Sequence, residues 1–328
     1  MKKFINQVDD ALVESLSGFA SAHADLLCVE FDPTFVCRRV PKRNAVAVVS
    51  GGGSGHEPLH SGYVGPGMLD AACPGQVFTS PTPDQWMAAA HRVNAGRGVL
   101  FIVKNYAGDR LNFQMASDML VDLDHLMVVI DDDVAIEHST HASGRRGVAG
   151  SMIVEKMVGA AAEAGADLFD CKALGDRING ATASMGVAFN SCTVPASGVA
   201  TFEIGEHEME LGVGIHGEPG RERVLFAPAA RIVDLLLAPI LKDLALARGR
   251  EVLLLVNGLG GTPLMELYLL HHHARQRLRD EGLEVARVLV GNHTTALEMA
   301  GASLTVTALD DEAKRLWDAP VHTAALRW

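Results

Sequence analysis

The sequence has little cysteine and few aromatic residues. Its 328 residues include five cysteines at scattered positions, and no two of them form a C-x-x-C pair. Such a set argues against a disulfide framework or a zinc site, and we expect buried, reduced thiols. Aromatic residues make up only 5% of the chain, whereas there are 33 glycines. Small residues suit helices packed closely on parallel strands better than an all-β sandwich.

The sequence also lacks an excess of positive charge and any long apolar run. Its formal net charge is −12, which argues against nucleic acid or an anionic membrane as the main partner. No apolar run reaches the length that spans a membrane. The acidic residues Asp9, Asp10 and Glu14 interrupt the apolar region that a signal peptide would need. We therefore expect a cytoplasmic protein with no membrane or nucleic-acid partner.

A third absence concerns nucleotides. The chain holds no G-x-x-x-x-G-K-[ST] sequence and no protein-kinase motif set. Its glycine-rich segment at residues 51–56 is not the dinucleotide fingerprint either, because a histidine occupies the position of the last glycine. The sequence therefore contains no recognisable ATP site of its own.

The length and the apolar pattern predict two domains. Three apolar runs, Ala45–Val49, Val99–Val103 and Leu126–Ile130, alternate with helical stretches, and each ends in polar or glycine-rich sequence. Buried parallel strands whose carboxyl ends open into a crevice have this pattern. We expect an α/β fold of two α/β domains. Residues 1–185 form a domain with a largely parallel sheet, and residues 186–328 form a second α/β domain with a mixed sheet.

The remaining elements are expected from periodicity. The predicted helices cover residues 7–22, 148–164, 228–246 and 264–278, and the predicted later strands cover 198–215, 251–256, 285–290 and 303–308.

Residues 50–58, S-G-G-G-S-G-H-E-P, are the first candidate site. Four glycines in five positions after a strand let the backbone approach a ligand and expose N–H groups. A plain tight turn is the alternative, but the histidine at the end of the cluster favours a site. His56 to His60 also match H-E-x-x-H, which binds zinc only when both histidines lie on one helix. Pro58 disfavours helical geometry there, so we do not expect a metal.

Two further segments carry candidate residues. Lys104 and Asp109 follow the strand 99–103 and should open into the same crevice. Asp109 is either a helix N-cap or a catalytic base, and Lys104 either holds an anionic or hydroxyl group or is a solvated strand end. His216, which lies between glycines in G-V-G-I-H-G-E-P-G at 212–220, is either a structural turn residue or open to a ligand.

Three charged clusters have less specific interpretations. Asp131 to Asp133 form a cation site or, more commonly, a solvated strand end or helix cap. His271 to His273 are adjacent on a predicted helix and do not share a face, so no tight metal site follows. Arg145 and Arg146 are a docking contact or a solvated turn.

Together these segments resemble the substrate-binding K subunit of dihydroxyacetone kinases. The resemblance extends from about Lys2 to Trp328. It is carried by residues 50–58, by F-T-S-P-T-P-D at 78–84, K-N-Y-A-G-D at 104–109, G-R-R-G-V-A-G at 144–150, G-V-G-I-H-G-E-P-G at 212–220 and the ending L-W-D-A-P-V-H-T at 316–323.

The resemblance implies roles for particular residues. In the family, the histidine matching His216 adds to the carbonyl of dihydroxyacetone and forms a covalent hemiaminal. The aspartate matching Asp109 takes the proton of the hydroxyl that attacks phosphorus, and the histidine matching His56 assists. Gly53, Ser54, Gly55 and Lys104 line the pocket together with His56 and Asp109.

The resemblance also implies partners. The chain carries no nucleotide domain, so the split, phosphoenolpyruvate-dependent system is expected. There an L subunit carries ADP or ATP with magnesium, and an M phosphocarrier protein recharges it. This chain would itself need no cofactor and would form a homodimer. Two alternatives remain open: a ligand-sensing co-regulator of a transcription factor, and a kinase subunit for another short ketose such as erythrulose.

Overall fold

The structure is a computed structural model that describes residues 2–135, 144–218 and 220–328. Two compact units are present. The first contains Met1–Ile130, Ser151–Arg177 and Arg315–Trp328, and the second contains Asp131–Gly150 and Ile178–Lys314. The chain therefore passes between the units several times, whereas the sequence predicts a single boundary near residue 185. In particular, the C-terminal residues return to the first unit.

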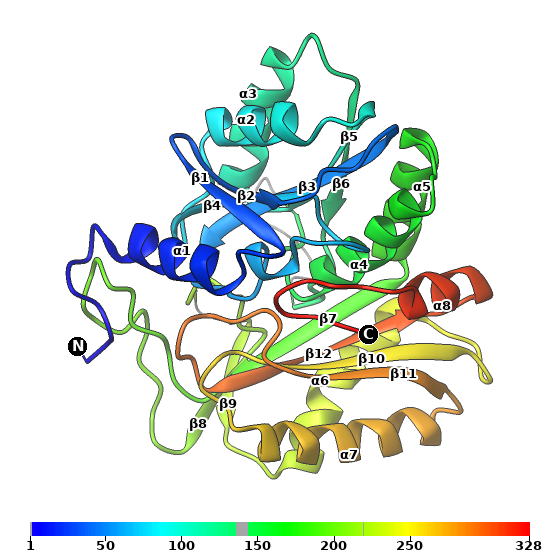
Figure 1. The fold of residues 1–328 in the computed structure, drawn as a ribbon. Helices are drawn as coiled ribbons and strands as arrows, with labels where there is room; N and C mark the ends of the chain where they lie inside the picture. The colour runs from blue at the N-terminus through cyan, green and yellow to red at the C-terminus, as the bar shows by residue number, and fades with distance from the viewer. Residues whose placement is uncertain (1, 136–143, 219) are drawn as a thin grey trace. The chain divides into compact units, whose positions relative to one another are not determined.

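The first unit contains a six-stranded sheet in the order β1-β2-β4-β3-β5-β6 (Figure 1). Its strands are β1 (Leu27–Phe31), β2 (Thr34–Arg38), β3 (Ala45–Ser54), β4 (Ala71–Val77), β5 (Gly96–Lys104) and β6 (His125–Ile130). The neighbours β4, β3, β5 and β6 run parallel, and the hairpin β1–β2 adds an antiparallel edge. The prediction of a largely parallel sheet is confirmed.

Strand β3 continues further than the sequence predicts. The apolar run Ala45–Val49 is its first half, and Ser50 to Ser54 form the second half between β4 and β5. Glycine is a weak strand former because it has no side chain to pack. Here the absent side chain is what allows close packing, since a Cβ at Gly51 would lie 2.8 Å from the carbonyl oxygen of Cys73. The expected glycine-rich turn is therefore a strand up to Ser54 and a turn only from Gly55.

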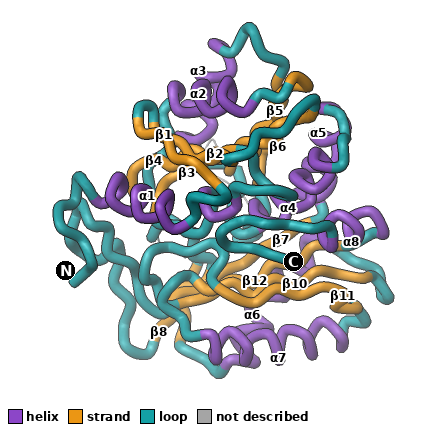
Figure 2. The backbone as a smooth tube through the Cα atoms, in the orientation of Figure 1, coloured by secondary structure: helices purple, strands orange, loops and turns teal. Residues whose placement is uncertain are grey.

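Helices pack on this sheet. Those of the first unit are α1 (Ala11–Ala22), α2 (Pro83–Val93), α3 (Ala107–Met119), most of α4 (Gly150–Glu163) and of α5 (Leu168–Gly180), and the short 3-10 helix η1 (Ser61–Tyr63). Helices α2 and α3 cover one face of the sheet (Figure 2). Beneath them, Trp86, Phe101 and Phe113 pack edge to face or tilted, with ring centroids 4.8–5.9 Å apart.

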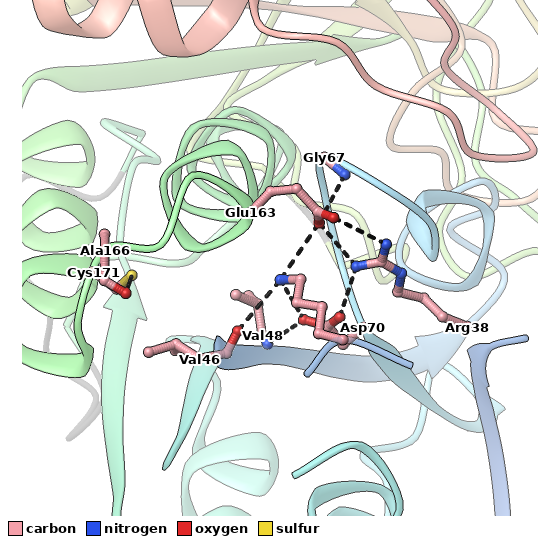
Figure 3. Close-up of polar contacts among 9 residues, drawn as sticks. Arg38, Val46, Val48, Gly67, Asp70, Glu163, Ala166 and Cys171 are labelled. Carbon is pink, nitrogen blue, oxygen red and sulfur yellow. Dashed lines mark hydrogen bonds and ion pairs between the residues drawn. The ribbon is translucent and has the colours of Figure 1, made fainter. Parts of the chain in front are cut away.

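A buried ion cluster fixes the end of α4 against this sheet (Figure 3). Arg38 donates to Asp70 and to Glu163, each at 2.9 Å, and Lys42 lies 2.8 Å from the second oxygen of Asp70. The same carboxylate accepts a hydrogen bond from the backbone N–H of Val48 in β3. Because charged groups are buried at acceptable cost only when they are paired, this cluster constrains where α4 lies on the sheet.

The second unit contains a six-stranded mixed sheet in the order β11-β10-β12-β7-β8-β9 (Figure 1). Its strands are β7 (Thr182–Ala188), β8 (Glu208–Leu211), β9 (Glu222–Leu225), β10 (Glu251–Gly258), β11 (Glu284–Gly291) and β12 (Gly301–Ala308). Only β10 and β11 pair in parallel, so the prediction of a mixed sheet in a second α/β domain is confirmed. Helices α6 (Ala229–Leu244) and α7 (Leu264–Asp280) bury their apolar faces against it.

Two details of the second unit differ from the sequence prediction. Of the stretch 198–215, only Glu208–Leu211 is a strand, because alternation without hydrogen-bonding partners does not make a sheet. The strand β7 and the helix α8 (Asp311–Asp318), which bridges the two units in sequence, are not among the predicted elements.

All five cysteines are free, and four are buried. Among the described residues, no helix has the length and apolar character needed to cross a membrane.

Candidate functional site

Lysine 104 lies at the end of β5, against the glycine-rich end of β3. Its side chain is fully buried. A Cβ built on Gly52 would lie only 2.1 Å from the Lys104 Nζ, so any side chain at position 52 would displace the ammonium group. The glycine-rich sequence therefore makes room for a buried cation beside the strand.

Lys104 connects the sheet to two other segments. Its Nζ lies 2.8 Å from Nε2 of His60 and 3.3 Å from the carbonyl oxygen of Gly51, and it forms an ion pair of 3.7 Å with Asp109. Asp109 is the third residue of α3 and is only 2% exposed. It is not the N-cap of α3, a position that Tyr106 occupies without a side-chain cap. The structure thus brings Lys104 and Asp109 together and removes the capping interpretation of Asp109.

Beyond Lys104 the contacts continue into α4. Nδ1 of His60 lies 2.5 Å from Oε1 of Glu155 and 3.0 Å from the hydroxyl oxygen of Ser50. The Ser50 hydroxyl in turn donates to the carbonyl oxygen of Ile102. Glu155 is fully buried and His60 is 5% exposed. These residues form a buried polar row that runs from Asp109 to Glu155.

Burial changes the ionisation of two members of this row. It raises the pKa of Glu155 to about 8, although Ser50 and Lys104 act in the opposite direction. Burial, together with the positive charge of Lys104, lowers the pKa of His60 well below its ordinary value. Near neutral pH both groups are therefore mostly uncharged, because each would lose its hydration on ionising without a fully compensating partner.

His56 lies in the turn after β3. Its ring is fully buried and stacks on Phe78, with centroids 5.0 Å apart and planes inclined by 17°. Residues 57–60 form turns rather than a helix, so the H-E-x-x-H histidines do not share a helix face. Within the described residues, no group of three or more His, Cys, Asp or Glu side chains is arranged to hold a metal ion.

The backbone of the same turn is partly engaged by the protein itself. The N–H of Gly55 donates to the carboxylate of Glu57, at 3.0 and 3.1 Å, and the hydroxyl of Ser54 donates to the carbonyl oxygen of Gly75. A cavity of about 10 Å³ lies beneath Gly52, Gly53 and Ser54. That volume admits at most one water molecule.

In the second unit, His216 lies in the loop between β8 and β9 and is half-buried. Its backbone N–H donates to Glu218 at 2.9 Å, and Glu218 accepts a hydrogen bond of 3.1 Å from Arg146. A Cβ at Gly214 would lie 1.9 Å from the same carboxylate, so a side chain there would displace Glu218. Pro219 lies outside the described residues. His216 belongs to the second compact unit, whereas His56 and Asp109 belong to the first.

The remaining predicted clusters have structural partners. Asp132 accepts hydrogen bonds from the N–H groups of Val148 and Gly150 at the start of α4. Of the alternatives for the aspartate cluster, these bonds agree with the helix cap. Asp133 and Arg146 form an ion pair of 2.6 Å, and both are largely buried. The docking and solvated-turn interpretations of Arg146 are therefore wrong. Arg145 pairs with Asp243 at the surface.

The sequence alone predicts no role for Ser50, His60 or Glu155. In the sequence, His60 is only the second histidine of an H-E-x-x-H motif that is not expected to bind zinc. A signal for Glu155 was present, because Glu155 and Lys156 interrupt an otherwise apolar stretch of α4. A charged residue in such a stretch is buried only with a partner, although the sequence alone does not identify that partner.

The fold is that of a two-unit α/β protein. At the end of a parallel strand of the first unit, Lys104, Asp109 and His60 form a buried row, and residues of these types can transfer protons to and from a small polar ligand. The chain belongs to the Dak1 domain family, whose sequence model matches residues 17–325. It is 46% identical to a protein of Escherichia coli (strain K12) named PEP-dependent dihydroxyacetone kinase, dihydroxyacetone-binding subunit DhaK, over all of this chain and 99% of that one.

Two solved structures have the same fold. The dihydroxyacetone kinase of C. freundii in its native form matches with a TM-score of 0.92 and 33% identity, over 99% of this chain and 60% of that one. A dihydroxyacetone kinase operon co-activator, Dha-DhaQ, matches with a TM-score of 0.90 and 32% identity, over 98% of each chain.

Proposed function

We propose that this chain is the dihydroxyacetone-binding subunit of a dihydroxyacetone kinase, a phosphotransferase that acts on an alcohol group. The observation that carries the proposal is its 46% identity along nearly the whole E. coli subunit. The buried Lys104–Asp109 pair at the end of parallel strands supports it, because it places a candidate general base beside a cation in a buried position.

The substrate is bound covalently in this proposal. A ring nitrogen of His216 adds to the carbonyl carbon of dihydroxyacetone, the carbonyl oxygen gains a proton to become a hydroxyl, and the ring gives up its own proton. The product is a neutral hemiaminal. Glycerol has hydroxyls but no carbonyl, so it forms no adduct. The contacts of Glu218 and Arg146 to the His216 loop support this role, since they fix the backbone of the nucleophile.

The transfer itself is acid–base catalysis with positioning. Asp109 accepts the proton of the terminal hydroxyl as its oxygen attacks phosphorus, and His56 assists the proton movement. Lys104 forms an ion pair with Asp109, and Gly53, Ser54 and Gly55 contribute the wall of the pocket. The product is dihydroxyacetone phosphate.

The phosphoryl group comes from a partner in this proposal. An L subunit carries the nucleotide and magnesium, an M phosphocarrier protein recharges it from phosphoenolpyruvate, and this chain forms a homodimer. The naming of the E. coli relative as a PEP-dependent subunit supports the split arrangement. The nucleotide and its metal supply charge neutralisation on the transferring phosphoryl group, while the residues of this chain bind and deprotonate the acceptor.

A second candidate function is ligand sensing. It is favoured by one observation, the fold shared with the co-activator at 32% identity over 98% of each chain. A sensor would bind dihydroxyacetone without turning it over and pass the signal to a transcription factor. Assaying turnover with purified L and M proteins separates the two functions, because only a kinase subunit forms dihydroxyacetone phosphate.

The hemiaminal is tested by intact-protein mass spectrometry after soaking in dihydroxyacetone and reduction-free desalting. We expect a mass increase of one ketone in the wild type and none in His216→Ala. Persistence of the adduct in His216→Ala would show that another group carries it. Parallel soaks with erythrulose and glycerol, followed by turnover assays, test the substrate: a short-ketose kinase of broader range would turn over erythrulose as well.

A further inference from the structure

Four ionisable side chains in the first unit form one continuous buried row. Asp109, Lys104, His60 and Glu155 come from α3, β5, the turn before η1 and α4, and none is more than 5% exposed. The contacts along the row measure 3.7, 2.8 and 2.5 Å. The proposed function uses only Asp109 and Lys104, so it leaves His60 and Glu155 without a role.

The donors and acceptors along the row have a fixed direction. An ammonium group has three donors and no acceptor, so Nε2 of His60 must accept from Lys104. The single proton of the neutral ring is therefore on Nδ1, where it points at Oε1 of Glu155 and at the Ser50 hydroxyl oxygen. Glu155 thereby selects the tautomer of His60 that accepts from Lys104.

Glu155 is suited to this task because it stays largely protonated at neutral pH. Its Oε1 then accepts as a carbonyl oxygen, and its Oε2, which is buried and has no hydrogen-bonding partner among the described residues, carries the proton. Tyr63 and Lys104 are the other ionisable groups whose charge interacts with Glu155. The ion pair of Lys104 with Asp109 lowers the cost of burying the row.

The contact with His60 is important for holding the Lys104 ammonium group in place. The backbone partner of that group, the carbonyl oxygen of Gly51, is 3.3 Å away, and its ion pair with Asp109 is longer than a direct hydrogen bond. The contact of 2.8 Å to His60 is the shortest of the three. His60 is therefore the main restraint on where the ammonium group lies relative to Asp109.

We propose that His60 and Glu155 are positioning residues, which act through Lys104 to hold its ammonium group beside Asp109. The inference rests on the proposed function, because it treats Asp109 as the base of the transfer. It adds two residues to Lys104 and Asp109, one from the turn before η1 and one from α4.

The test compares a disrupting and a conservative variant at each position. Glu155→Leu removes the acceptor, and we expect kcat/KM for dihydroxyacetone to fall about tenfold, because the ammonium group of Lys104 then loses its fixed position beside Asp109. Glu155→Gln keeps an amide oxygen for Nδ1–H and should stay close to wild type. His60→Leu should lose as much as Glu155→Leu, and the double variant should lose no more than either single one.

A matched pair on the same helix controls for loosening of α4. Glu163→Leu and Glu163→Gln break the ion pair with Arg38 eight residues further along α4 and should leave kcat/KM near wild type. Equal losses of kcat/KM in the Glu155 and Glu163 variants would assign the effect to helix packing and overturn the proposal. Equal losses in Glu155→Leu and Glu155→Gln would also overturn it. The same holds if the losses of the two single variants multiply in the double variant.

A second measurement is independent of turnover. The ¹⁵N shifts of the His60 ring in the ligand-free protein should show a protonated Nδ1 and an unprotonated Nε2, and Glu155→Leu should produce a mixture of tautomers. A protonated Nε2 in the wild type overturns the positioning scheme whatever the substrate is. If the ring has the expected tautomer but no dihydroxyacetone is turned over with the partner proteins, the proposed function fails and the arrangement of the row stands.

Discussion

The Nζ of Lys104 lies 2.8 Å from the Nε2 of His60, with both side chains buried behind the glycine-rich end of β3. This contact joins two segments that are 44 residues apart, and it exists only because position 52 has no side chain. Lys104 is also the cation that pairs with Asp109 among the described contacts, so the same side chain links His60 to Asp109.

Replacing Lys104 by methionine should lower kcat/KM by about 100-fold, the usual effect of removing one preorganised charge from a buried site. Methionine fills a similar volume but leaves Asp109 without the cation that pairs with it. Steady-state kinetics with dihydroxyacetone and the partner proteins measure the loss.

Lys42→Met provides the matched control for that change. Lys42 is also buried and also pairs with an aspartate, Asp70, at 2.8 Å in the same unit. It should lower the thermal stability without lowering kcat/KM. Comparable kinetic losses in the two variants would mean that Lys104 matters only for stability.

A methyl group at position 52 should displace the Lys104 ammonium group without replacing any ionisable residue. The Cβ of Gly52→Ala would lie 2.1 Å from Nζ, so the ammonium group must move away from its place beside Asp109. A displacement of about 1 Å in a catalytic site costs about 100-fold in rate, so we expect a loss of that order in kcat/KM. Gly18→Ala is the control, because a Cβ there meets nothing within 4 Å in helix α1. It should leave activity unchanged and stabilise the helix by about 1 kcal/mol.

The sequence predicts the local features of this site well. The apolar runs before residues 50 and 104 place both segments at the carboxyl ends of neighbouring parallel strands, and β3 and β5 are indeed paired in that way. Strand β3 was predicted too short because glycine is a poor strand former, and only its neighbours β4 and β5 hold it extended as far as Ser54.

The non-local features were not predictable in the same way. His60 and Glu155 are 95 residues apart, and no periodicity links a turn to the middle of a helix. Asp109 illustrates a different limit. An aspartate after a glycine near a helix start is commonly an N-cap, but here it is the third helical residue and turns toward a lysine from the adjacent strand. Tertiary contacts decide between two locally equivalent roles.

In the second unit, removing Arg146 should slow adduct formation at His216. Arg146 donates to Glu218 and to the carbonyl oxygen of Gly212, and Glu218 accepts from the backbone N–H of His216. Arg146→Leu removes both contacts, so the loop loses its alignment and the rate of adduct formation should fall about 100-fold. Time-resolved mass spectrometry after mixing with dihydroxyacetone measures that rate.

Arg145→Leu is the neighbouring control, since Arg145 pairs with the partly exposed Asp243. Surface pairs contribute little, so adduct formation should continue at the wild-type rate. An Arg146→Leu variant that forms the adduct as fast as Arg145→Leu would show that the His216 loop keeps its alignment without the guanidinium group.

The pH dependence of stability should distinguish two glutamates of helix α4. Burial raises the pKa of Glu155 from 4.5 to about 8 in the folded protein. Between these values the unfolded chain has lost this proton and the folded protein still holds it, so folding binds a proton and becomes less favourable as the pH rises. Glu155→Gln has no such proton, and its stability relative to wild type should therefore increase from about pH 5 to about pH 8.

Glu163→Gln should give the opposite trend. Although burial acts to raise its pKa, Arg38 and Lys42 hold the pKa of Glu163 below its ordinary value. Its carboxylate therefore stabilises the folded protein above the unfolded pKa, and that contribution disappears as the pH falls through the folded pKa. The variant should be less stable than wild type near neutral pH and approach it in acid. Urea unfolding measures the two slopes, from about pH 5 to about pH 8 for Glu155→Gln and below about pH 5 for Glu163→Gln. A stability of Glu155→Gln relative to wild type that does not increase from about pH 5 to about pH 8 would mean that the folded protein holds Glu155, like Glu163, as a carboxylate.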